Sequence, residues 1–188
     1  MYRLFLLTCK NKKIDIKFIY MPVPKKVINF LEKNRARYEI VEHRTVYTAF
    51  DKVKTLKVKP NIVGKTLVLK GDKDLIFVLI PANKNLDKNK FKKIVNIWRK
   101  KQGKKSVKKI EFVSERVIKN KIKGVKLGAI PPFGSLFGYP TFVNKSLLSQ
   151  RKIILNSGIP DFSVRITTAS FKKIIPDMIS ANFVKAKK

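Results

Sequence analysis

The chain has few of the residues that most enzymes use for chemistry. Its 188 residues include one cysteine, Cys9, and one histidine, His43. A single cysteine cannot form an intramolecular disulfide, and one Cys with one His cannot fill the four positions of a structural zinc site. No apolar run reaches the ~18–20 residues of a membrane-spanning helix. The GxSxG, P-loop, GxGxxG and HExxH motifs are absent too, so we expect neither a metal nor a cofactor.

Acidic residues are scarce as well. The chain has 44 Lys and Arg against 12 Asp and Glu, a formal net charge of +32. Such a charge favours polyanions as partners, nucleic acid first and an anionic membrane surface second. A compositional interpretation stands beside this one, because 36 of the 44 are lysine, as an AT-rich coding sequence would produce. That bias leaves the scarcity of acids unexplained, so the sequence still predicts affinity for a polyanion.

The first twenty residues differ from the rest of the chain. Their apolar stretch, residues 4–7, is too short for a signal-peptide core, and no small-residue cleavage site comes after it, so we expect a cytoplasmic protein. Met21 begins a sequence typical of a domain start. The alternative to an extension here is an edge strand with one apolar face, formed by Ile14, Ile16 and Phe18. We divide the chain into an extension or translation artefact over 1–20, a domain over 21–176 and a basic tail over 177–188, and we expect residues 180–188 to fray.

Apolar periodicity predicts short helices interleaved with strands. The helices are expected over 24–34, 49–57, 88–100, 115–121 and 169–175. The strands are expected over 38–43, 65–70, 75–80, 110–113, 140–144, 152–156 and 163–167. The expected N-caps are Thr48, Asp87, Ser114 and Thr168. A Gly71-Asp72 turn joins two strands into a hairpin, and the whole pattern indicates a mixed α/β or α+β sheet rather than a doubly wound one.

Four stretches in order carry a family resemblance. They are EHRTVYTA over 42–49, IVGKTLVL over 62–69, GAIPPFG over 128–134 and IILNSG over 153–158. Each stretch alone is weak, but their order and spacing over roughly 24–175 resemble the YbaK/prolyl-tRNA synthetase editing-domain family of aminoacyl-tRNA deacylases. The resemblance implies one compact domain with a mixed, largely antiparallel, curved sheet flanked by short helices. It also implies a free-standing enzyme that hydrolyses the ester of mischarged tRNA with neither a protein nucleophile nor a metal.

The resemblance also assigns site residues. Lys65 and Gly128 are the expected catalytic residues, with Lys65 holding the terminal adenosine or its phosphate and Gly128 placing the ester against the backbone. A lysine that opens a strand can also simply reach solvent, and a lone histidine such as His43 is structural about as often as it binds. The expected substrate-binding residues are His43, Tyr47, Thr66, Ala129, Ile130, Pro131, Pro132, Phe133, Asn156, Ser157 and Gly158.

The resemblance further implies a mechanism and partners. The attacking water would be activated largely by the 2′-hydroxyl of the tRNA, and the usual target is a small amino acid such as Ala or Cys on tRNA(Pro). Phe133 and Phe137 are candidates for stacking on the terminal adenine. The expected partners are tRNA and a synthetase such as prolyl-tRNA synthetase, and the expected tRNA contacts are Lys100, Lys101, Lys104 and Lys105. Asn144 stands where many members have an aspartate, which keeps a non-catalytic RNA-binding regulator as the alternative.

Overall fold

The computed structural model describes residues 23–186. The expected N-terminal extension over 1–20, its alternative edge strand and Cys9 lie outside the described residues. The helices are α1 (Lys25–Lys33), α2 (Ala49–Thr55), α3 (Lys88–Lys101), α4 (Glu115–Lys121), α5 (Lys145–Leu148) and α6 (Thr168–Ile174), with 3-10 turns η1 (Pro60–Ile62) and η2 (Gly134–Phe137). The strands are β1 (Tyr38–Glu42), β2 (Gly64–Gly71), β3 (Asp74–Pro81), β4 (Ile110–Phe112), β5 (Thr141–Asn144), β6 (Lys152–Asn156), β7 (Phe162–Thr167) and β8 (Ile179–Ala181).

Two of the four predicted N-cap residues make a capping hydrogen bond. Thr48 accepts a hydrogen bond from the Asp51 N–H at the start of α2, and Asp87 accepts from two N–H groups at the start of α3. Ser114 occupies the predicted N-cap position of α4, but its side chain makes no capping hydrogen bond. The last helix begins one residue earlier than predicted, and Thr167 rather than Thr168 caps it by accepting from the Ser170 N–H.

The strands form two sheets, and the predicted mixed, largely antiparallel α/β fold is confirmed. Three antiparallel strands make one sheet in the order β1-β7-β6, and five strands make the other in the order β4-β2-β3-β5-β8. In the larger sheet β3-β5 and β5-β8 are parallel pairs, and the rest are antiparallel. A parallel bridge between Val63 and Ile154 joins the two sheets.

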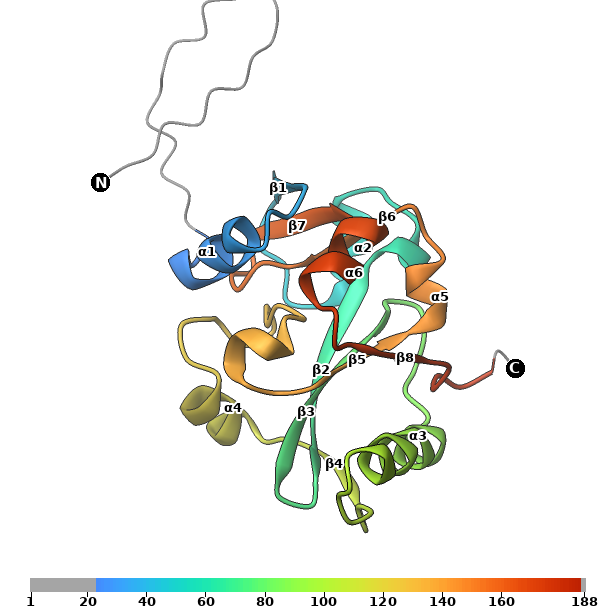
Figure 1. Ribbon diagram of the computed structural model, residues 1–188. Helices are drawn as coiled ribbons and strands as arrows, with labels where there is room; N and C mark the ends of the chain where they lie inside the picture. Colours follow the sequence, from blue (N-terminus) through green and yellow to red (C-terminus); the bar gives the residue numbers. More distant parts are fainter. Residues whose placement is uncertain (1–22, 187–188) are drawn as a thin grey trace, which may run out of the picture.

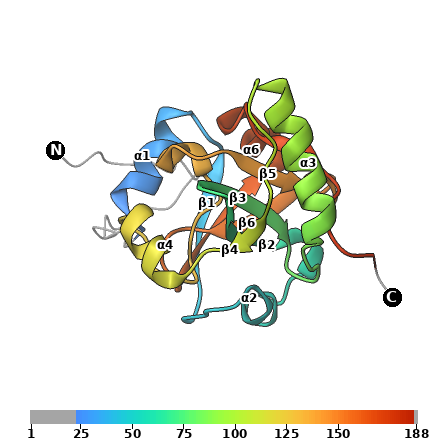
Figure 2. The ribbon, with the colours of Figure 1, turned by 90° about the horizontal axis from the view of Figure 1, so that it is seen from below.

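In the hairpin β2-β3, strand β3 is buried on both of its faces, which explains its unbroken apolar run. Alternate residues of β3 enter different cores: Ile76 and Val78 pack with Phe91 of α3, whereas Leu75 and Phe77 pack with Ile122 just after α4. Figures 1 and 2 show α3 and α4 on opposite sides of this hairpin. A third core lies between the smaller sheet and the helices α1, α5 and α6.

The C-terminal segment was expected to fray, and the structure corrects that. β8 pairs with β5 in parallel, and Val184 forms a bridge with Leu86. Phe183 is fully buried and packs on Phe91, with ring centroids 5.2 Å apart. The burial of Phe183 therefore anchors this segment to the domain. The lysines around Phe183 in the sequence suggested an exposed tail instead. Between residues 23 and 186, each helix falls short of the length and apolar character required to cross a membrane.

Candidate functional site

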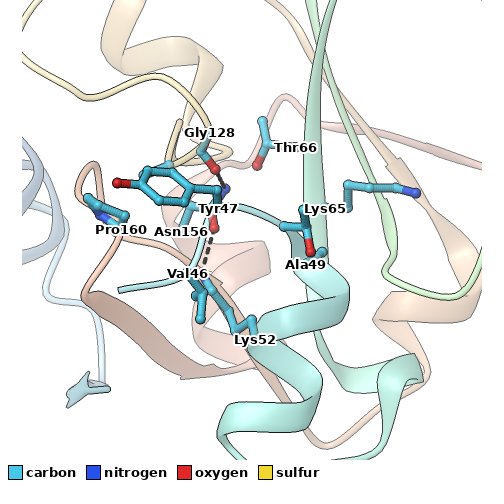
Figure 3. A pocket seen from close by; sticks show the side chains of 11 residues that line it. Val46, Tyr47, Ala49, Lys52, Lys65, Thr66, Gly128, Asn156 and Pro160 are labelled. Atoms are coloured by element: carbon cyan, nitrogen blue, oxygen red, sulfur yellow. Dashed lines mark hydrogen bonds between the residues drawn. The ribbon is translucent and has the colours of Figure 1, made fainter. Parts of the chain in front are cut away.

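One cavity of about 270 Å³ collects residues from all four sequence stretches. The first stretch supplies four lining residues, the second supplies two residues of β2, the third supplies two loop residues, and the fourth supplies one polar side chain. Figure 3 shows these residues lying around the start of α2, on β2 and in the loop before η2, with the Lys65 side chain directed away from the others. The lining residues are Val46, Tyr47, Thr48, Ala49, Lys52, Lys65, Thr66, Gly128, Ala129, Asn156 and Pro160.

Close strand packing creates this convergence. A Cβ on Gly64 would come within 2.8 Å of Leu155 Cδ2 on β6 and of Leu79 Cδ1 on β3, so a larger residue there would displace these leucine side chains. This packing places Thr66 of β2 and Asn156 at the end of β6 on the same cavity.

The loop over residues 128–134, called here the glycine-proline loop, and the residues just before it are connected to the turn after β6 by backbone hydrogen bonds. The Gly158 N–H donates to the Ala129 carbonyl at 2.9 Å, and the Lys126 N–H donates to the Gly158 carbonyl at 2.7 Å. Gly128 has φ +78°, a conformation that side chains rarely adopt, and its Cβ position lies 3.4 Å from the Tyr47 carbonyl. The loop can therefore present backbone groups at the cavity in a fixed shape.

Lys52 is the functional candidate that sequence reasoning missed. Lys52 is only 4% exposed, and its Nζ donates a hydrogen bond to Asn156 Oδ1 at 2.6 Å. Burial lowers the pKa of Lys52 from its ordinary value of 10.5 to about 8. The sequence did contain a signal, because Lys52 lies three residues after Ala49 and four before Leu56, and residues at this spacing share one face of a helix.

Asn156 connects that lysine to the loop. While its Oδ1 accepts from Lys52, its Nδ2 donates to the Ile130 carbonyl at 3.2 Å and to the Gly128 carbonyl at 3.4 Å. Two backbone acceptors at Nδ2 fix which end of the amide faces Lys52. The predicted residue Asn156 thus lies at the cavity and holds both the Lys52 side chain and the backbone of the glycine-proline loop in place.

Lys65 lines the cavity, but its ammonium group is engaged elsewhere. Its Nζ donates to the Lys84 carbonyl at 3.0 Å, and Figure 3 shows the side chain directed away from Lys52. Partial burial lowers the pKa of Lys65 below its ordinary value. Its neighbour Thr66 faces the cavity, and within residues 23–186 the buried Thr66 Oγ1 finds no hydrogen-bond partner.

His43 and Ser157 are held in structural bonds outside the cavity lining. His43 Nδ1 donates to the Arg44 carbonyl at 2.9 Å, so its Nε2 accepts from the Ser163 hydroxyl at 2.8 Å. Burial, with a smaller contribution from the charge of Lys52, lowers the pKa of His43 and favours the neutral ring. Ser157 is fully buried and donates to the Phe162 carbonyl at 2.8 Å.

The rest of the glycine-proline loop lies behind the cavity. Ala129 lines it, whereas the next four predicted residues are buried and support the loop from the core: Ile130, Pro131, Pro132 and Phe133. Phe133 is fully buried, and the Phe137 ring lies 5.6 Å from that of Phe77. The exposed aromatic residue at the cavity is instead Tyr47, at 70% exposure.

Two further predicted positions have structural explanations. Gly158 has φ +107°, and a Cβ there would come within 2.9 Å of Pro24 Cγ, so glycine is required for packing. Asn144 is fully buried, and its Oδ1 accepts from the Ser146 N–H and hydroxyl at the start of α5. The neutral side chain at position 144 thus works as a helix cap.

The basic residues at the end of α3 lie apart from the cavity. Lys100, Lys101, Lys104 and Lys105 are all exposed. The adjoining segment is fixed to the tip of the β2-β3 hairpin by bonds from the Lys108 and Lys109 N–H groups to Asp72. From Thr66 to Gly71, β2 spans roughly 17 Å at ~3.3 Å per residue. The exposed lysines and the cavity thus lie at opposite ends of one strand.

The residues that line the cavity are cationic, polar and apolar. Within the described part of the chain, no three His, Cys, Asp or Glu residues come together in a way that could hold a metal ion. The cavity lining, as far as residues 23–186 define it, contains two lysines and no carboxylate. Its chemistry therefore consists of cations, amide and hydroxyl groups, and backbone groups at the Gly128 loop.

Comparisons with known proteins identify the family and the fold of the chain. The sequence matches the family model of the aminoacyl-tRNA editing domain over residues 43–174. A solved structure of a protein proposed to be a trans-editing enzyme for prolyl tRNA synthetase has a TM-score of 0.72 at 19% identity, covering 88% of this chain and 99% of the other. A structure described as a hypothetical protein has a TM-score of 0.69 at 17% identity, covering 86% of this chain and 100% of the other. At these identities the likeness concerns the fold, and no curated protein matches the sequence.

Proposed function

We propose that this chain, which belongs to the aminoacyl-tRNA editing domain family, hydrolyses the ester of a mischarged tRNA in the cavity beside α2. The observation that carries the proposal is the cavity itself. Four sequence stretches between residues 42 and 158 resemble the family, and each of them contributes at least one lining residue. A cavity lined by all four of these stretches is the arrangement expected of a ligand site in this family.

The proposed division of roles rests on the geometry. The ester lies against the backbone at Gly128, where the absence of a Cβ leaves room, and the buried Thr66 Oγ1 is available to it. Lys65 releases the Lys84 carbonyl and takes the terminal adenosine or its phosphate. The remaining predicted residues of the loop support its shape from the core.

Water activation is assigned to the substrate. No carboxylate lines the part of the cavity formed by the described residues, and both ring nitrogens of His43 already have partners. A vicinal 2′-hydroxyl of the tRNA can accept a hydrogen bond from the attacking water and give its own proton to the departing 3′-oxygen, so that the water proton is relayed to the leaving group without a protein base. Substrate-assisted attack therefore suits this set of residues better than a histidine-based mechanism.

The tRNA itself is proposed to cross the surface beyond the cavity. Tyr47 presents an exposed ring at the cavity, which suits stacking on the terminal base, a role expected from the sequence for Phe133 and Phe137. The four lysines at the end of α3 would contact phosphates further along the acceptor arm. From the family resemblance, the first substrates to consider are small aminoacyl groups such as Ala or Cys on tRNA(Pro), with prolyl-tRNA synthetase as a candidate partner.

A panel of charged tRNAs tests the proposal. It contains Ala-, Cys-, Ser- and Pro-tRNA(Pro), Asp-tRNA and one unrelated correctly charged tRNA, assayed with wild type, Lys65→Ala and Lys70→Ala. Lys70 is the matched control, because it lies on the same strand and is absent from the cavity lining. We expect hydrolysis of at least one mischarged species, lost in Lys65→Ala and kept in Lys70→Ala.

The charge of the chain supports the second candidate, a non-catalytic RNA-binding regulator. Between residues 99 and 109 there are seven basic residues and no acidic one. Salt-dependent tRNA binding with no hydrolysis of any charged species would establish the regulator and reject the enzyme.

A further inference from the structure

Lys52 and its surroundings form a buried cationic end of the cavity. We propose that this end recognises a carboxylate on the aminoacyl side chain, so that the preferred substrate is a small acidic aminoacyl ester, an aspartyl ester first. The inference rests on the proposed deacylase function and changes only its substrate, replacing alanine and cysteine. The proposal concerns recognition and leaves the hydrolytic step as described above.

The first observation is a buried charge with a neutral partner. Lys52 is 4% exposed, and its ammonium donates to the amide oxygen of Asn156 at 2.6 Å. An ammonium has three N–H donors, so two remain after this bond. A buried charge is costly unless an opposite charge faces it, and the described lining contains no carboxylate. An anionic ligand would supply the missing partner.

The second observation is the direction of the cavity. Figure 3 shows Lys52 at one end of the labelled residues and Gly128 with Thr66 at the other, with Tyr47 between them. Tyr47 is 70% exposed, whereas Lys52 is buried, so the cavity deepens toward Lys52. A folded tRNA cannot enter about 270 Å³, and only the aminoacyl group and the terminal ribose are small enough. The deep end therefore meets the amino-acid side chain rather than a phosphate.

The third observation is that Lys52 is poorly explained as a structural residue. It occupies the inward face of α2 with Ala49, where an apolar side chain would pack without desolvating a charge. Burial lowers its pKa to about 8, which still leaves the ammonium mostly protonated at pH 7. A cation at that place repels basic aminoacyl side chains and makes no favourable interaction with apolar ones. It therefore discriminates against both classes as well as binding an acidic side chain.

Deacylation by wild type and Lys52→Met tests the proposal. The substrates are tRNAs charged with Asp, its neutral isostere Asn, and Ala. We expect wild type to hydrolyse the aspartyl ester at least about 10-fold faster than the other two, because a site built for a polar group rejects analogues that lack it. Lys52→Met should abolish that preference, so that the variant hydrolyses the aspartyl, asparaginyl and alanyl esters at similar rates. Equal loss on all three esters would assign Lys52 to the reacting ester and overturn the proposal, as would a wild-type preference for Ala.

A binding measurement separates this inference from the proposed function. The probes are the amide-linked analogues 3′-deoxy-3′-(aspartylamino)adenosine and its alanyl counterpart, titrated calorimetrically into wild type, Lys52→Met and the surface control Lys54→Met. We expect the aspartyl analogue to bind at least about 10-fold tighter than the alanyl one to wild type and Lys54→Met, and with equal affinity to Lys52→Met. That result without hydrolysis would reject the enzyme and keep the anion site. Equal affinities in wild type would reject the anion site even if hydrolysis occurs.

Discussion

The helices α2 and α3 differ in whether their lysines are buried or exposed. In α3 the apolar residues Phe91 and Val95 are buried, and the lysines lie at the surface or close to it. In α2 the buried residue is Lys52, while Phe50 of the same helix is 55% exposed. The arrangement in α3 is that of a scaffold helix, whereas α2 departs from the rule that apolar residues face the core. Local inconsistency of this kind is typical of functional sites, so the unusual burial of one lysine is more informative than the number of lysines.

The largest effect should come from the scaffold helix. Phe91→Ala removes a fully buried ring that packs edge-on against Phe142 and Phe183, each 5.2 Å away. We expect the free energy of unfolding to fall by about 3–5 kcal/mol. Lys93→Ala, an exposed position on the same helix, should change it by less than about 0.5 kcal/mol. Chemical denaturation measures both, and similar values for the two variants would contradict the assignment of α3 as scaffold.

The next effect has the opposite sign and belongs to α2. Replacing Lys52 by Met should stabilise the fold at pH 7, because the lysine pKa falls from 10.5 to about 8 on folding. The protonated lysine therefore disfavours the folded state below pH 8 by about 3 kcal/mol, and this penalty disappears as pH rises from 8 to 10.5. His43, the neighbouring group that the charge of Lys52 affects, stays neutral throughout that window.

The pH dependence distinguishes this cause from a simple packing effect. The difference in unfolding free energy between Lys52→Met and wild type should be largest at pH 7 and shrink toward pH 10.5. A gain that is independent of pH would indicate better apolar packing alone, and a loss of stability at pH 7 would refute the account of Lys52.

A smaller effect concerns the exposed ring at the cavity. Tyr47→Ala removes the proposed stacking platform for the terminal base, and such stacking is worth about 1–3 kcal/mol per base. We expect KM for the charged tRNA to rise by about 5- to 100-fold with little change in kcat or in Tm. Phe112→Ala is the control, because Phe112 is also exposed, at 55%, and lies outside this cavity. An equal rise in KM for both variants would remove the special role of Tyr47.

The smallest effect should come from the surface of α3. Changing Lys100, Lys101, Lys104 and Lys105 to Gln should weaken tRNA binding by about 3- to 10-fold and flatten its salt dependence. A matched set of four exposed lysines on α1 and α6 removes the same charge elsewhere, through Lys25, Lys33, Lys172 and Lys173. If both sets reduce the slope of log Kd against log salt equally, binding depends on net charge and the end of α3 is not a specific contact.

The sequence predicted the architecture better than it predicted the site. The helices and strands between residues 24 and 175 lie within a few residues of their predicted bounds, because their apolar periodicity and the Gly71-Asp72 turn act locally. The short helix α5 and the strand β8 were missed. β8 depends on pairing with β5 and on the burial of Phe183, which are long-range contacts that local periodicity does not contain.

The site could be predicted as a set of segments but less well residue by residue. The resemblance pointed to the four segments that meet at the cavity, including Lys65, Thr66, Gly128 and Asn156. It did not point to Lys52, because a lysine in a lysine-rich chain attracts no attention and its burial depends on how α2 sits against β6. The reverse holds for Phe133, whose place beside the glycine-proline loop suggested a substrate contact, although the ring is buried in the core.

The most direct test of the whole account is the single-turnover deacylation rate at saturating enzyme. It would be measured for wild type, Lys65→Ala and the variant with the four α3 lysines changed to Gln. We predict that wild type and the four-lysine variant hydrolyse a mischarged tRNA at the same rate, because saturation compensates for weaker binding, and that Lys65→Ala loses the activity. Absence of hydrolysis by wild type, or a rate that depends on the α3 lysines and not on Lys65, would contradict the claim that the cavity is the site of the reaction.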